Sequence, residues 1–298
     1  MKNKGTIGHI AAFITIFIWG TTFISTKVLL VQFQPIEILF YRFVVGFLAL
    51  LVVYPHRLKG TTGKQEITFA IAGLCGICLY YLLENIALTH TLASNVGVII
   101  SVAPFFTAIL THICGKLQSN QEKKTEKLKW NFFMGFLVAM IGIFMISMGG
   151  SEVAWNWKGD LLAFGAAFVW ACYSVLTRKI GNFEYPTVLT TRRVFFYGIL
   201  FMIPAMLLFD IQWSFHAIIN PIYGLNLLFL GLGASALCFV TWNFAVKVLG
   251  AVKTSVYIYM VPVITVIASM LVLQEKITIY MGIGTVLTLI GLLVSERG

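Results

Sequence analysis

The residues best suited to chemistry are a carboxylate and a guanidinium placed inside apolar segments. Glu84 stands deep in one nonpolar run, and Arg42 lies inside another. At 1.5 Å of rise per helical residue, both would lie roughly 10 Å below the same membrane surface. A charge at that depth costs several kcal/mol unless it is paired or hydrated, so it is a candidate for function. Two interpretations follow: an ion pair between neighbouring helices, or a carboxyl that binds a proton or a substrate ammonium group.

A second arginine, Arg193, matches Arg42 when the two halves of the chain are aligned, but Trp242 stands where the first half has Glu84. Arg193 is therefore expected to lack an equivalent acidic partner and to lie near the cytoplasmic surface. There it would extend its charged end to lipid phosphates, as long basic side chains do at membrane boundaries. The alternative role is attraction of an anionic group of the substrate, such as a carboxylate.

Neutral polar and aromatic side chains complete the set of candidate residues for substrate binding or coupling. Asn85 and Asn243 occupy matching positions, where an amide can bond either to a neighbouring helix or to a substrate. Aromatic side chains can line a cavity or anchor a helix at the membrane surface. The candidate wall residues are Trp19, Phe23, Tyr80, Trp170, Tyr173, Trp242, Tyr257 and Tyr259.

Two prolines lie near the middle of apolar segments at matching positions, Pro104 and Pro262. Proline lacks the backbone N–H that would bond to the residue four earlier, so the carbonyls of Ile100 and Ile258 lose their usual donor. Such interruptions are tolerated where a neighbouring helix or a water-filled cavity satisfies the backbone. The prolines are thus interpreted either as packing kinks or as gating positions.

The sequence lacks the motifs that activate a nucleophile or hold a phosphate. It contains no H-E-x-x-H, no G-x-S-x-G and no G-x-x-x-x-G-K-[ST] sequence. Cys75 and Cys78 have C-x-x-C spacing, but no second cysteine pair or nearby histidine completes a metal site, so a packing role is favoured. We therefore predict no catalytic residue, no metal and no cofactor. An integral-membrane enzyme or a channel-like protein without its own ATP hydrolysis is the alternative class.

Composition places the chain in the membrane class. Hydrophobic residues make up 59% of it, charged residues only 11%, and the mean hydropathy is +0.91. Soluble domains carry roughly 25% charged residues, so this chain has too little polar surface for a soluble globule. A spanning helix needs about 20 largely apolar residues. Such segments occur at 9–30, 36–54, 68–89, 93–115, 131–149, 158–178, 187–209, 222–247, 251–273 and 278–295. The first is interpreted as a helix, because no small-residue cleavage pattern of a signal peptide follows it.

The formal charge of +10 is distributed unevenly around these segments. With the N-terminus inside, cytoplasmic stretches hold fifteen of the 21 basic residues, and outer stretches hold only Lys158 and Lys276. An excess of Lys and Arg marks cytoplasmic loops. The charge pattern thus predicts a multi-pass protein of the cell membrane, with both termini in the cytoplasm. In this setting the positive charge does not indicate binding to nucleic acid.

The two halves of the chain repeat at nearly fixed spacing. Pairs 151 residues apart are Trp19 and Trp170, and Arg42 and Arg193; pairs 158 residues apart are Asn85 and Asn243, and Pro104 and Pro262. Five helices per half is an odd number, so the second copy enters the membrane in the opposite sense, as in many secondary transporters. We expect an all-α membrane protein of ten transmembrane helices in two inverted five-helix repeats, residues 1–150 and 151–298.

These motifs resemble an EamA-type member of the drug/metabolite transporter superfamily over essentially the whole chain. The resemblance rests on Trp19-Gly20-Thr21-Thr22-Phe23, Asn85-Ile86-Ala87-Leu88, Ala93-Ser94 with Pro104, and Ala251-Val252 with Pro262 and Gln274-Glu275. The family often has an acid after both proline-containing helices, whereas the first half here has Lys116-Leu117-Gln118. The resemblance implies an exporter or exchanger that works by alternating access.

The sequence as a whole predicts a secondary transporter of a small metabolite. Amino acids and related compounds, moved outward, are the favoured substrates because of the family resemblance and the aromatic candidate wall. The driving force is either the gradient of the substrate or exchange against protons. The expected partners are the lipid bilayer and a small molecule.

Overall fold

The computed structural model describes residues 2–90, 93–117, 130–148, 157–209, 211, 213–273 and 278–296, and every regular element in these ranges is a helix. Six helices are long and apolar enough to cross a membrane: Lys4–Leu29, Pro35–Val53, Gly63–His90, Trp157–Gly181, Thr187–Leu207 and Pro221–Leu249. Four shorter apolar helices cover Ala103–Cys114, Trp130–Met145, Ala251–Thr265 and Gly282–Ser295. The chain is therefore a multi-pass membrane protein. Six of the predicted segments overlap the long helices, and each of the other four contains one of the shorter helices for most of its length.

The first half of the chain contains α1 (Lys2–Leu29), α2 (Pro35–Val53), α3 (Gly63–Gly73), η1 (Leu74–Leu79), α4 (Tyr80–His90), α5 (Ala93–Ile100), α6 (Ala103–Leu117) and α7 (Trp130–Met148). The second half contains α8 (Trp157–Gly181), α9 (Thr187–Leu208), α10 (Phe215–Ile218), α11 (Pro221–Leu228), η2 (Phe229–Leu237), α12 (Cys238–Leu249), α13 (Ala251–Val256), η3 (Tyr257–Tyr259), α14 (Met260–Leu273) and α15 (Ile279–Glu296). Most of the predicted polar loop at 116–129 lies outside the described residues.

Helix starts follow local sequence signals. Gln34 and Glu37 form a capping box at the start of α2, where Pro35 occupies the first turn. Thr62 caps α3 by accepting a bond from the Gln65 backbone N–H, and Asn220 caps α11 in the same manner. Polar caps satisfy amide groups that have no partner inside the helix. These caps mark the positions at which a predicted loop ends and the next helix begins.

Interruptions of the helices occur at matching places in the two halves. The segments η1 and η2 are π-helical turns, each set between two α-helical stretches of a long span. Pro104 lies in the first turn of α6, after a break at two turn residues, and Pro262 lies in the first turn of α14, directly after the 3₁₀ turn η3 that interrupts the α-helix. Prolines fit there because their missing N–H needs no partner. The segment predicted as one helix over 93–115 is therefore two shorter helices.

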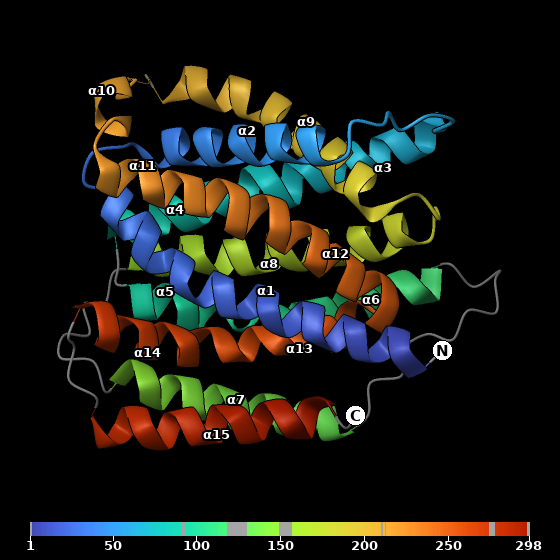
Figure 1. Ribbon diagram of the computed structural model, residues 1–298. Coiled ribbons are helices and arrows are strands. Elements are labelled where there is room, and N and C mark those ends of the chain that lie inside the picture. The colour runs from blue at the N-terminus through green and yellow to red at the C-terminus, as the bar shows by residue number, and fades with distance from the viewer. Residues whose placement is uncertain are drawn as a thin grey trace.

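Helices of the two halves pack against each other throughout the bundle. α1 lies against α12 and α14, α2 against η2, α3 against α9, and α4 against α8. At one edge α7 and α15 run side by side (Figure 1). A Cβ atom at Gly291 would lie 2.4 Å from the backbone nitrogen of Ala139, so this pair of helices requires glycine at that contact. The start of α1 and the end of α15 lie at the same end of the bundle (Figure 1).

Candidate functional site

A cavity lies between helices of both halves at the centre of the bundle. Its walls come from α1, α4, α5, α8, η3 and α14. The lining residues are Ile16, Trp19, Thr22, Phe23, Tyr80, Tyr81, Glu84, Ile100, Trp170, Ile258 and Val261. Glu84 is the charged residue among them, so the cavity has one acid in an otherwise aromatic and aliphatic wall.

Five of the eleven residues of this wall are aromatic. Trp19 packs edge-on against Trp170 with ring centroids 5.2 Å apart, and Trp170 lies 4.7 Å from the ring of Tyr80. The indole N–H of Trp19 donates to the carbonyl of Ala234, 2.9 Å away in the π-helical turn η2. This bond fixes the ring at the wall. Faces of aromatic rings attract cations, and the attraction grows where water is excluded.

Glu84 is buried, with 2% of its surface exposed. Its carboxyl interacts electrostatically with Arg42 and with the hydroxyl of Tyr80. It faces the same cavity as Trp19, Tyr80 and Trp170. A carboxylate bordered by aromatic rings is a suitable counter-charge for an ammonium group, and in its protonated form it can also carry a proton.

Arg42 is fully buried on α2 and does not hydrogen-bond to Glu84. Its Nε donates to the hydroxyl of Ser235, at 3.1 Å, and its guanidinium carbon lies 4.2 Å from the ring centroid of Tyr81. Its two terminal nitrogens have no hydrogen-bond acceptor among the residues that the structure describes. The structural ion pair that the sequence allowed between these two residues is not formed here.

The prediction that Arg193 lacks an acidic partner is wrong. Its guanidinium donates to both carboxylate oxygens of Glu66 on α3, at 2.8 to 3.2 Å. The hydroxyls of Tyr197 and Thr61 donate to the same carboxylate, each at 2.6 Å. Neighbouring Arg192 donates to the carbonyls of Tyr54 and His56. The side chain of Arg193 thus links the two halves instead of extending to lipid phosphates.

Sequence reasoning missed this partner because it assigned Glu66 to the loop before the third span. The structure begins that helix at Gly63, which places Glu66 in its first turn. The capping residue Thr62 and the helix-favouring acid just after it were the available signals. Glu66 lies in the other half of the chain. An alignment of the two halves compares equivalent positions, so it does not reveal contacts between the halves.

The two matched asparagines both serve as links between helices. Asn243 accepts a bond from the Tyr173 hydroxyl, at 2.7 Å, and donates to the Thr191 hydroxyl, at 2.9 Å. Asn85 donates to the carbonyl of Pro35, at 3.0 Å, at the start of α2. These contacts match the hydrogen-bonding interpretation of the pair, and Tyr173 lies with Asn243 instead of in the central cavity wall.

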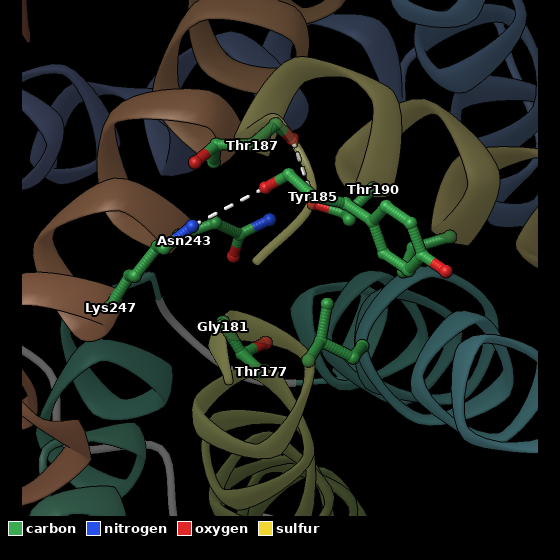
Figure 2. Close-up of a pocket in the computed structure, with 9 residues that line it drawn as sticks. Thr177, Gly181, Tyr185, Thr187, Thr190, Asn243 and Lys247 are labelled. Atoms are coloured by element: carbon green, nitrogen blue, oxygen red, sulfur yellow. Dashed lines mark hydrogen bonds between the residues drawn. The ribbon is translucent and has the colours of Figure 1, made fainter. Parts of the chain in front are cut away.

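A second, smaller cavity lies wholly in the second half of the chain (Figure 2). Asn243 and Lys247 of α12 line it, opposite residues of α8 and α9. The Lys247 amine donates to the carbonyl of Tyr185, at 3.3 Å, as Figure 2 shows. Because its polar groups, such as Asn243 and Lys247, are already bonded to other protein groups, this cavity is a weaker candidate for a transported molecule.

The remaining predicted residues lie outside the central wall. Trp242 is fully buried behind Trp19, with ring centroids 5.1 Å apart. The Tyr257 hydroxyl bonds to His9 Nδ1, at 2.7 Å, and Tyr259 is buried in a separate apolar cluster near α7. Pro104 and Pro262 are buried next to the helix breaks but do not line the cavity. The structure thus brings together Trp19, Phe23, Tyr80, Glu84 and Trp170, and adds Tyr81, which sequence reasoning did not select.

A multi-pass bundle with a central cavity walled by both halves is the architecture of membrane transporters. The chain matches the EamA-like transporter family over residues 6–148 and 157–296, and it belongs to that family. The resemblance inferred from its motifs is thereby confirmed. One matched range lies in each half of the chain.

Relatives with curated names are transporters as well. An uncharacterized transporter of Archaeoglobus fulgidus is 27% identical over 288 residues, covering 95% of each chain. The uncharacterized transporter YyaM of Bacillus subtilis is 28% identical and covers 93% of this chain and 89% of its own. A protein of Streptantibioticus cattleyicolor named a probable terminal-alkyne amino-acid exporter is 23% identical, over 96% of this chain and 92% of its own. A solved crystal structure with 18% identity matches 97% of both chains with a TM-score of 0.74, which supports the fold.

Proposed function

We propose that this protein is a secondary transporter that exports an amino acid or a related small metabolite through the central cavity. The observation that carries the proposal is the placement of buried Glu84 among Trp19, Tyr80 and Trp170 in a cavity walled by both halves. An ammonium group entering that cavity meets a carboxylate and several ring faces at once. A similar protein named as an amino-acid exporter agrees with this substrate class.

The proposed mechanism is alternating access between two inverted five-helix repeats, residues 1–150 and 151–298. Ten spans with both termini in the cytoplasm are part of the proposal, which rests on the charge bias and on the shared end of α1 and α15 in Figure 1. The breaks before Pro104 and Pro262 give each half a site where a helix can bend. Ile100 and Ile258, which stand beside those breaks, line the cavity. Movement at the breaks would therefore reshape its wall.

Glu84 has two possible tasks in such a cycle, and both use the same carboxyl. It binds the substrate ammonium group directly, or it carries a proton in exchange for the substrate. In either case its charge is neutralised during passage, which lowers the cost of holding it away from water.

The test is exchange across liposomes that contain the purified protein. Exchange of a labelled amino acid should be faster than in protein-free liposomes, and should saturate as its concentration rises. Failure over a broad panel of amino acids and related metabolites, with folding verified by thermal unfolding, would contradict the proposal. Generation of a chemically altered product would instead favour the membrane enzyme.

The orientation has its own test. Single cysteines replacing Ser151 and Ser119, in a chain without the five native cysteines, should react with an impermeant reagent from outside and inside respectively. The opposite pattern would reverse the proposed topology.

A further inference from the structure

Arg42 is a buried cation that the described part of the protein leaves largely unpaired. None of its surface is exposed, and of its nitrogens only Nε has a hydrogen-bond acceptor there, the Ser235 hydroxyl at 3.1 Å. A guanidinium presents five N–H donors and is never deprotonated in proteins. Burying such a group without acceptors carries a large desolvation cost. A residue in this situation needs a physical reason to be charged.

Arg42 lies one aromatic ring away from the central cavity. Its guanidinium carbon is 4.2 Å from the ring centroid of Tyr81, and Tyr81 lines the cavity together with Glu84. The charge of Arg42 also interacts with the Glu84 carboxyl. The cavity therefore has an acid in its wall and a base directly behind that wall, and the two do not hydrogen-bond to each other.

The matched arginine shows a guanidinium that is paired with a carboxylate in this fold. Arg193 holds both oxygens of Glu66 in a fork that also receives the hydroxyls of Tyr197 and Thr61. The fork geometry of arginine suits a carboxylate. Arg42 has the same donors and, among the residues that the structure describes, no carboxylate bonded to them.

We propose that Arg42 binds the carboxylate of the transported molecule and so determines its specificity, while Glu84 binds the ammonium group of that molecule. The inference rests on the proposed function and adds the residue that binds the carboxylate end of the substrate. A zwitterion placed between these residues neutralises both and brings no net charge into the membrane. The Tyr81 ring must turn aside, or the carboxylate must pass its edge, for contact to form.

The test compares two ligands that differ only by the carboxylate: phenylalanine and phenethylamine, the amine without that group. Binding to purified protein is measured by titration calorimetry. Wild-type protein should bind phenylalanine at least about tenfold more tightly, as expected for a charge-assisted bond. The Arg42→Gln variant should lose that preference and bind phenethylamine within about twofold of wild type. Arg42→Lys keeps the charge without the fork and should retain part of the preference.

The matched control is Arg193→Gln, whose side chain is bonded to Glu66 and lies outside the cavity. It should leave the ratio of the two affinities unchanged. If Arg42→Gln weakens binding of both ligands equally, Arg42 is only a counter-charge for Glu84 and the inference is overturned. Should Arg42→Gln fail to fold, the ligand comparison on wild type and Arg42→Lys decides: equal affinity of wild type for both ligands also overturns it.

Failure of this inference can be told apart from failure of the proposed function. Wild-type protein that exchanges no amino acid across liposomes refutes both. Wild-type protein that exchanges amino acids, together with an Arg42→Gln variant that keeps the preference for phenylalanine, refutes only the role of Arg42.

Discussion

Two regions that match in sequence, one around Arg42 and one around Arg193, differ in how their polar groups are bonded. Around Arg193 the charge meets the Glu66 carboxylate, and Asn243 uses both its donor and its acceptor. Around Arg42 the two terminal nitrogens lack acceptors, and the carbonyl oxygen of Asn85 lacks a donor, among the described residues. Saturated bonding stabilises a fold, whereas unsatisfied buried groups next to a cavity indicate a place for a ligand.

The matched tryptophans show the reverse difference. Trp19 of the first half donates its N–H to Ala234, whereas the N–H groups of Trp170 and Trp242 have no acceptor within the described ranges. The wall of the central cavity therefore contains one indole held by a hydrogen bond, Trp19, and one held by ring packing, Trp170. The contrast between the halves concerns individual bonds and not a general loosening of one half.

Loss of Asn243 should give the largest change in stability. Asn243→Ala removes partners of the buried Tyr173 and Thr191 hydroxyls, and we expect a loss of roughly 2 to 4 kcal/mol in the free energy of unfolding. Asn85→Ala removes a single bond to Pro35 and should cost about 1 kcal/mol. Thermal unfolding of the purified proteins measures both. Equal losses would remove the distinction between the two regions.

Breaking the ion pair should have the next largest effect. Arg193→Gln leaves the half-buried Glu66 carboxylate with hydroxyl donors only, and we expect a loss of about 1 to 3 kcal/mol. The double variant with Glu66→Gln should lose less than the sum of the two single variants, because the two side chains interact. Additive losses would show that this contact contributes nothing as a pair.

The smallest expected effect concerns one indole hydrogen bond. Trp19→Phe removes the donor to Ala234 and should cost about 1 kcal/mol more than Trp242→Phe, whose N–H bonds to no residue in the described ranges. Both substitutions remove similar ring area, so their difference isolates the bond. A larger loss for Trp242→Phe would contradict this assignment.

Much of the fold could be predicted from residue patterns. Apolar length located the six long helices, and Pro104 and Pro262 predicted local interruptions, because a missing N–H acts locally. The sequence predicted only in part which residues share one wall, since aromatic residues also occur at membrane surfaces. The residues that the structure groups there are Trp19, Phe23, Tyr80, Glu84 and Trp170. Tyr81 was missed because adjacent residues of a helix point about 100° apart, whereas Tyr80 and Tyr81 both line the cavity.

Other features depend on contacts between distant segments. The partner of Arg193 lies on α3, more than a hundred residues earlier, and no local signal connects Glu66 with it. The π-helical turns η1 and η2 were likewise not predicted from the sequence. Such features can be recognised only once the helices are placed next to one another in the folded protein.

The most direct test of the account compares two acids, Glu84 in the cavity and Glu66 in the ion pair. Amino-acid exchange across liposomes is measured for Glu84→Gln and Glu66→Gln over a range of pH, with the same amount of folded protein. Exchange by Glu84→Gln should fall by at least about tenfold, and Glu66→Gln should stay within about twofold of wild type. Exchange by Glu84→Gln at the wild-type rate, with unchanged pH dependence, would contradict the assignment of the central cavity as the transport site.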